Sequence, residues 1–293
     1  MKFNIAYLGP VSLFHLRRDF ILCLKYSLED LGHECILSGL NLDASYLNLI
    51  IGAYFLPNSE IEKIYKSGMK YININTEIMA NGMLNYNPAK VDFAGSYVPL
   101  IRNGITAWDV VLDNTSEYEK FGVAGHFLRW GYHPKLREVD HKHQKDLDFY
   151  FFGSMSERRR RVIHLLQAEG LRGIADGDCP YYVRNDRIAR AKVQLNLIQD
   201  EKYTHVNSFR VCYLANNNSY TLSEKENDPA GYLDYTDVVS QHEDLAKKIT
   251  EVLKTNSWVA KAEAQAASFE KISMTKVFEK LLDESINTCS LYP

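Results

Sequence analysis

The sequence predicts an α/β protein with two similar halves, each built around a parallel sheet. Short, nearly continuous apolar segments alternate with helical patterns, which is typical of parallel strands covered on both faces. A strand-loop-helix pattern that begins at Phe3 begins again at Asp148. The chain has 293 residues, about twice the ~150 of an average domain. We therefore expect two Rossmann-like domains facing across a cleft, with ligands at the carboxyl ends of the strands.

The first half begins with a strand and a helix. Residues 3–8 are apolar and end at Gly9-Pro10, as expected of a buried strand that reaches its loop. The apolar side chains from Phe20 to Leu31 fall on one helical face, and Gly32 occupies the position of a left-handed cap. The same reasoning predicts further strands at 35–37, 47–55, 71–75, 108–112 and 126–130, and helices at 58–68 and 117–121.

The second half repeats this arrangement. A strand at 148–152 ends at Gly153-Ser154, and Ser156 caps a helix that runs to Gly170. Strands are predicted at 193–198 and 220–222, and helices around 188–191 and at 208–214, 238–253 and 258–286.

The polar segment from Lys135 to Lys145 lacks apolar periodicity and is the expected linker. The expected domains are residues 1–138 and 139–270, and residues 271–293 form a helix long enough to pack back on the first domain.

Composition excludes several classes of protein. The formal net charge is −3, which argues against bulk nucleic acid or an acidic membrane as the main partner. The five cysteines show neither a disulfide framework nor zinc spacing. The longest apolar stretch, residues 47–56, is about half of a membrane span, and the first residues do not resemble a signal peptide. We therefore expect a cytoplasmic protein without a membrane span.

Polar residues at the ends of the strands in the second half are candidates for anion binding. Gly153 and Ser154 precede a capped helix whose N–H groups could hold a phosphate, although an ordinary turn has the same pattern. Arg158 is the nearest of four consecutive arginines to the helix start. Arg210 lies in the first turn of the next helix, where it could clamp a diphosphate or form an ion pair.

Ser223 and Glu224 follow a short strand, where a carboxylate could accept both hydroxyls of a ribose or could be a solvated loop acid. Neither Gly9 nor Gly153 belongs to a GxGxxG turn, so dinucleotide oxidoreduction is disfavoured. The DxD spacings at 146–148 and 176–178 are explained by a strand and by turn chemistry, so no metal site and no cofactor are expected.

Several of these motifs together resemble a known family. The segments 146–166, 187–197, 208–211 and 222–224 look like the C-terminal domain of GT-B glycosyltransferases, and the closest set is the bacterial and viral proteins related to the CgeB spore-maturation group. Residues 75–77 and 131–134 extend the resemblance into the first half. The resemblance implies an N-terminal acceptor domain, a C-terminal domain that holds a nucleoside-diphosphate sugar, and metal-independent transfer to an acceptor hydroxyl.

In an inverting reaction the first domain would supply the base, and Glu77, just beyond a strand, is the first choice and His15 the second. Retaining members often carry two glutamates eight positions apart, but Asn216 stands eight positions before Glu224. Two other functions stay open: a non-catalytic two-lobed protein that binds a nucleotide sugar or a small ligand, and a phage-type DNA glycosyltransferase. The net charge argues against the second.

Overall fold

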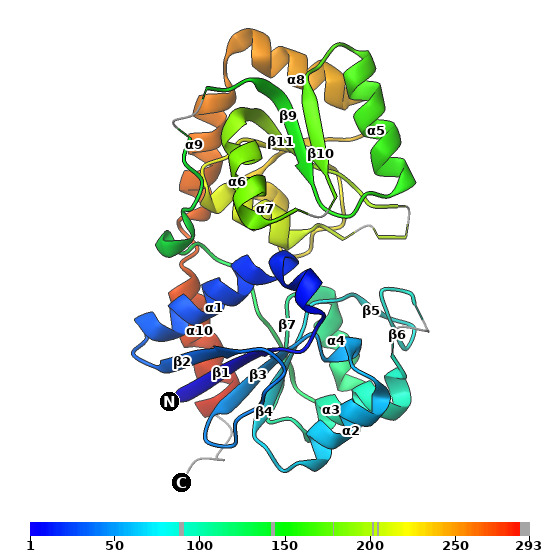
Figure 1. The fold of residues 1–293 in the computed structure, drawn as a ribbon, viewed down its shortest axis with the longest axis vertical. Helices are drawn as coiled ribbons and strands as arrows, with labels where there is room; N and C mark the ends of the chain where they lie inside the picture. Colours follow the sequence, from blue (N-terminus) through cyan, green and yellow to red (C-terminus); the bar gives the residue numbers. More distant parts are fainter. Residues whose placement is uncertain (88–90, 142–143, 178, 201, 204, 288–293) are drawn as a thin grey trace. The chain divides into compact units, whose positions relative to one another are not determined.

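The computed structural model describes residues 1–87, 91–141, 144–177, 179–200, 202–203 and 205–287. Contacts divide the chain into two compact units (Figure 1). Unit 1 comprises Met1–Trp130 and the chain from Met274 onward, and unit 2 comprises Gly131–Ser273. No helix in the described part of the chain is long and apolar enough to cross a membrane. None of the described cysteines forms a disulfide.

Unit 1 is built on a parallel sheet with the strand order β2-β1-β3-β4-β7-β8. Its strands are β1 (Lys2–Tyr7), β2 (Glu34–Ser38), β3 (Leu47–Ile51), β4 (Tyr71–Asn75), β7 (Ala107–Asp109) and β8 (Gly125–Phe127), and β5 (Met79–Ala80) pairs with β6 (Met83–Leu84) as a small antiparallel hairpin. Its helices are α1 (Arg18–Asp30), α2 (Asn58–Lys66), α3 (Val98–Asn103), α4 (Thr115–Glu119) and α10 (Met274–Leu282).

Every residue of β3 and β4 is buried, including the amides Asn48, Asn73 and Asn75, as expected of strands covered on both faces. Helix α10 packs on α1, and Phe278 of α10 lies edge-on to Trp108 of β7 with 5.6 Å between ring centroids. The indole of Trp108 also donates a hydrogen bond to Ser285 at 3.0 Å. The last described segment of the chain therefore completes the core of unit 1.

Unit 2 is built on a second parallel sheet with the strand order β10-β9-β11-β12-β13. Its strands are β9 (Leu147–Phe152), β10 (Gly173–Asp176), β11 (Ala191–Asn196), β12 (Thr221–Glu224) and β13 (Asp237–Val239). Its helices are α5 (Glu157–Ala168), α6 (Tyr181–Arg190), α7 (Ser208–Asn216), α8 (Asp244–Thr255) and α9 (Trp258–Phe269). The strands carry buried apolar side chains on both faces of the sheet, and helices cover each face (Figure 1).

Two expectations for the second half need correction, and one strand was missed. The segment 238–253 is not one helix, because residues 237–239 form β13, which pairs with β12, and the helix begins only at Asp244. The helix predicted at 258–286 is interrupted after Phe269, where Tyr132 N–H binds the carbonyl of Ile272 at 2.7 Å. Strand β10 carries no strong apolar signal and was not predicted.

The polar segment predicted as a linker belongs to unit 2. The amide oxygen of Asn217 accepts the N–H groups of Glu138 and Val139 at 2.8 and 3.0 Å. The amide oxygen of Asn216 likewise accepts the N–H of His133 at 2.9 Å. The described part of this segment is therefore tied to the end of α7, and its polarity does not mark a free connection.

Candidate functional site

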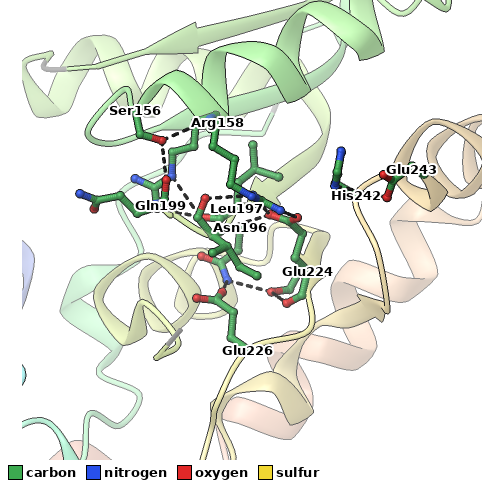
Figure 2. Close-up of polar contacts among 12 residues, drawn as sticks. Ser156, Arg158, Asn196, Leu197, Gln199, Glu224, Glu226, His242 and Glu243 are labelled. Carbon is green, nitrogen blue, oxygen red and sulfur yellow. Dashed lines mark hydrogen bonds and ion pairs between the residues drawn. The ribbon is translucent and has the colours of Figure 1, made fainter. Parts of the chain in front are cut away.

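The carboxyl edge of the unit 2 sheet brings together all six residues expected to bind an anion or a ribose. Gly153 and Ser154 lie between β9 and α5, and Gly153 has a φ of +129°, a conformation that favours glycine. Ser156 caps α5 by accepting the N–H of Arg159 at 3.2 Å, and its hydroxyl donates to the carbonyl of Gln199 at 2.5 Å (Figure 2). These bonds fix the start of α5 against the chain that leaves β11.

Arg210 is buried directly beside this loop, with 3% of its surface exposed. Its Nε donates to the carbonyl of Phe152 at 2.9 Å, and its Nη1 donates to Oδ1 of Asn196 at 2.7 Å. A Cβ at Gly153 would lie 2.4 Å from Nη2 of Arg210. The glycine therefore leaves the space in which the guanidinium lies.

Arg159 is a second buried arginine at this edge, and the sequence did not single it out. Its guanidinium donates to the carbonyl of Ser154 at 2.8 Å and to that of Leu197 at 2.6 Å. Burial lowers the pKa of Arg159 to about 10. Burial, followed by the charge of Arg159, lowers the pKa of Arg210 to about 9. An anion bound beside these two buried guanidinium groups would stabilise their positive charges.

Arg158 and Glu224 form a two-point ion pair at the same edge (Figure 2). Nη1 of Arg158 lies 2.9 Å from Oε2 of Glu224, and Nη2 lies 2.5 Å from Oε1. The N–H of Ile198 also donates to Oε2 at 2.7 Å. Hydrogen bonding to Glu224 raises the pKa of Arg158. Both carboxylate oxygens are therefore engaged, and a ribose would have to take over these bonds.

Ser223 is buried and binds the backbone of Glu224. Its hydroxyl donates to the carbonyl of Glu224 at 2.8 Å and accepts from Nδ2 of Asn196 at 2.8 Å. Asn196 also donates to Oε1 of Glu226 at 2.5 Å (Figure 2). Burial raises the pKa of Glu226 to about 7, against the opposing charge of Arg210. Glu226 was not predicted, although its position two residues after Glu224 was the available signal.

Glu77 of unit 1 lies just after β4, as predicted, but its carboxylate is buried and occupied. Nη2 of Arg17 lies 2.9 Å from Oε1 of Glu77, and the hydroxyl of Tyr54 donates to the same oxygen at 2.6 Å. The amide of Asn85 donates to Oε2. A carboxylate that accepts these bonds has a fixed orientation.

Two amides hold the backbone of Glu77, and the buried carboxylate of Asp109 binds both of them. Asn75 donates to the Glu77 carbonyl at 2.6 Å and to Asp109 at 2.8 Å. Asn114 donates to the same carbonyl at 2.8 Å and to both oxygens of Asp109 at 3.0 Å. Burial raises the pKa of Asp109 to about 7, against these hydrogen bonds. Asp109 therefore acts as a common anchor for two amides that fix Glu77.

His15, the second choice of base, lies in the 3₁₀ helix η1 (Val11–Leu16) and is half-buried. It precedes Arg17, the partner of Glu77, by two residues.

The described residues contain no group of three His, Cys, Asp or Glu side chains arranged to hold a metal ion. The two acids of the first DxD spacing pair with cations, Asp146 with Arg190 and Asp148 with Lys192. In the second spacing Asp176 accepts from Tyr150 at 2.9 Å, and Asp178 lies outside the described residues.

Comparisons of the whole structure identify the architecture. An alpha-glucosyltransferase in complex with UDP and a 13-mer DNA containing a HMU base has a TM-score of 0.63 at 10% identity, covering 97% of this chain and 98% of that chain. AviGT4, a glycosyltransferase involved in Avilamycin A biosynthesis, has a TM-score of 0.55 at 9% identity, covering 96% of both chains. TarM has a TM-score of 0.55 at 11% identity, covering 90% of this chain and 57% of its own.

No protein-family model and no curated protein matches the sequence. Identities this low show the fold and leave the activity to be argued from the site. With two parallel α/β sheets in one chain, matched along almost its whole length, the protein has the GT-B fold of these glycosyltransferases.

Proposed function

We propose that this protein is a glycosyltransferase that moves a sugar from a nucleoside diphosphate to an acceptor hydroxyl. The observation that carries the proposal is the group of three arginines, Arg158, Arg159 and Arg210, at the carboxyl edge of the unit 2 sheet. Open parallel sheets bind ligands at this edge. Two of these guanidiniums are desolvated, which suits them to a diphosphate and costs free energy without one.

The three guanidiniums and the N–H groups at the start of α5 would stabilise the diphosphate as it leaves the sugar. Fixed positive charge and oriented dipoles that act on the developing negative charge perform the role that a metal ion has in other transferases. Glu224, or Glu226 beside it, would accept the hydroxyls of the ribose. We therefore propose transfer without a divalent metal.

The acceptor hydroxyl must lose a proton, and Glu77 is our candidate base, with His15 as the alternative. Support comes from the fixed orientation of the Glu77 carboxylate by Arg17 and Tyr54. A retaining reaction is disfavoured because Asn216 is a buried amide that binds the backbone of His133.

The proposal is tested by calorimetry with UDP and by transfer assays with a panel of nucleotide sugars. Arg158→Ala and Arg161→Ala form a matched pair, because both lie on α5 but Arg161 is exposed and its one ion pair within the described part of the chain is with Glu157. We expect Arg158→Ala to weaken UDP binding about 10- to 100-fold, the value of a hydrogen bond to a charged group, and Arg161→Ala to change it little.

Arg210→Ala and Glu224→Ala are also expected to weaken UDP binding, and EDTA is expected to leave it unchanged. Equal affinities in all these variants, or binding that requires magnesium or manganese, would contradict the donor site. Tight binding of a nucleotide sugar without release of UDP in the presence of acceptors would show a binding protein instead of an enzyme.

DNA is the second candidate acceptor, and one observation favours it: the structure with a TM-score of 0.63 holds UDP together with DNA containing a HMU base. The test is transfer of labelled sugar to a duplex containing HMU and to an otherwise identical duplex without it. Incorporation into the first duplex alone supports a DNA acceptor. Incorporation into neither duplex would indicate that the acceptor is a small molecule and not DNA.

Two finer assignments are also part of the proposal. Relationship to the CgeB group is supported by the motifs between residues 146 and 224. A cytoplasmic location is supported by the described cysteines, none of which forms a disulfide.

A further inference from the structure

A cavity of about 190 Å³ lies at the amino end of the unit 2 sheet, away from the proposed donor site. Ala191 at the start of β11 and Tyr220 just before β12 line it, whereas the arginine group surrounds the other end of the same strands. At about 3.3 Å per residue, the 6 residues of β11 and the 4 residues of β12 separate the two edges by about 13–20 Å. The described lining residues are His141, Lys145, Ala191, Lys192, Gln194, Asn218, Ser219, Tyr220, Trp258, Val259 and Ala262.

The cavity has basic walls without an acid among its described lining residues. Lys192 pairs with Asp148 outside the lining at 3.3 Å. Lys145 instead contacts Nδ1 of His141 at 3.1 Å, the carbonyl of Ala191 at 3.1 Å, and the ring of Trp258. Burial lowers the pKa of Lys145 to about 8, since none of these groups is a counter-ion. An anion in the cavity would stabilise its charge.

The start of α9 adds to this preference. Trp258, Val259 and Ala262 occupy its first turns and face the cavity. The helix has 12 residues, and the N-terminus of such a helix carries partial positive charge that favours anions. The same three side chains give the cavity an apolar wall.

Gln194 belongs to the lining but offers no polar atom to a ligand. It is 1% exposed, and its Nε2 donates to the carbonyl of Ile188 at 3.2 Å. Its Oε1 accepts no hydrogen bond from any described residue, but this atom has almost no accessible surface, so a group in the cavity does not reach it. The charge of Lys145 and the apolar wall therefore decide which ligand fits.

We propose that this cavity binds a small organic acid that has a compact apolar body. Lys145 binds the carboxylate, and Trp258 and Val259 contact the apolar body. A cavity of about 150 Å³ accommodates benzene, so 190 Å³ suits an acid with one ring. This site is separate from the donor site and does not depend on the proposed glycosyl transfer.

The probe is benzoate, which has both features, and two analogues each lack one of them. Benzyl alcohol lacks the carboxylate, and acetate lacks the ring. Binding is followed in the full chain by the indole N–H resonance of Trp258, assigned with Trp258→Phe. We expect a dissociation constant on the order of 1 mM for an acid of this size. The Trp258 signal should shift to saturation, whereas those of Trp108 and Trp130, both in unit 1, should not.

Each analogue should bind at least about threefold more weakly than benzoate, since the alcohol loses the contact with Lys145 and acetate loses the contact with the apolar wall. Lys145→Met should weaken benzoate binding about tenfold. Lys254→Met, at an exposed lysine of α8 outside the lining, is the control. The proposal is overturned if Trp258 does not respond, if the alcohol binds as well as the acid, or if folded Lys145→Met binds like the control.

Discussion

Glu224 is the more deeply buried partner of Arg158: 2% of the glutamate side chain is exposed, against 21% of the arginine. The two residues are joined by two hydrogen bonds, at 2.9 and 2.5 Å. Removing Arg158 and removing the charge of Glu224 should therefore lower the stability of the fold by different amounts. Without Arg158 the buried carboxylate keeps one donor among the described residues, the N–H of Ile198, whereas without the Glu224 charge the arginine can turn toward solvent.

This inequality predicts the stability of two variants. Arg158→Met should lower the free energy of unfolding by about 3–5 kcal/mol, because it strands a buried charge. Glu224→Gln should lower it by at least about 1 kcal/mol less. Both values would be measured by thermal unfolding, at the transition whose midpoint temperature rises when UDP is added. Equal losses would show that the pair is solvated in solution.

Gly153 should be required for donor binding and not merely for folding. Gly153→Ala introduces a Cβ 2.4 Å from Nη2 of Arg210 at a φ of +129°, so it should displace the guanidinium. Gly170→Ala is the matched control, since Gly170 has a φ of +82° with nothing within 4 Å of its Cβ position. Gly170→Ala should lose about 1 kcal/mol of stability, and Gly153→Ala should lose more because its Cβ also clashes with Arg210. Calorimetry should show weaker UDP binding for Gly153→Ala alone. Equal UDP affinities in the two variants would show that Arg210 does not bind the donor.

Glu77→Gln keeps the shape of the side chain and removes the proton acceptor. If Glu77 is the base, turnover should fall about 10²–10⁴-fold while UDP affinity stays nearly constant. Tyr54→Phe is the companion variant, because it removes one hydrogen bond to Glu77 and leaves the carboxylate. Near-normal transfer by Glu77→Gln would eliminate it as the base and direct attention to His15.

Asp109 should make the stability of unit 1 depend on pH. Burial raises its pKa in the folded protein from 3.8 to about 7, so its contribution to stability is complete below pH about 4 and is lost as the pH rises through about 7. Asp109→Asn should remove this slope. The melting temperature across that range, compared with the exposed Asp113→Asn, measures it. Identical slopes in wild type and Asp109→Asn would show that Asp109 stays ionised.

Local signals account for what could be predicted of the fold. Gly32 and Gly170 both adopt a positive φ just beyond α1 and α5, where the sequence placed them. Tertiary pairing accounts for the errors. Val238 and Val239 favour a strand, but a run this short was included in the predicted helix, and residues 237–239 form β13 because they pair with the edge of β12.

The site was predictable in position and less so in detail. The positions of Gly153, Arg158 and Arg210 follow from strand ends, which the sequence reveals. Four consecutive arginines do not reveal that Arg159 is the buried one, because the packing of α5 on the sheet decides which of them turns inward. The use of Asn216 to hold the backbone of His133 joins residues 83 positions apart and has no local signature.

The packing of α10 on α1 has a consequence for the order in which the molecule forms during synthesis. Unit 2 is one uninterrupted segment, whereas unit 1 needs Phe278 and Ser285 to complete the surroundings of Trp108. Chains emerge from the ribosome at about 5–20 residues per second, and domains fold as units once their residues are available. The first half of the chain must therefore wait with part of its core open, and the unit translated second is the first that can finish folding.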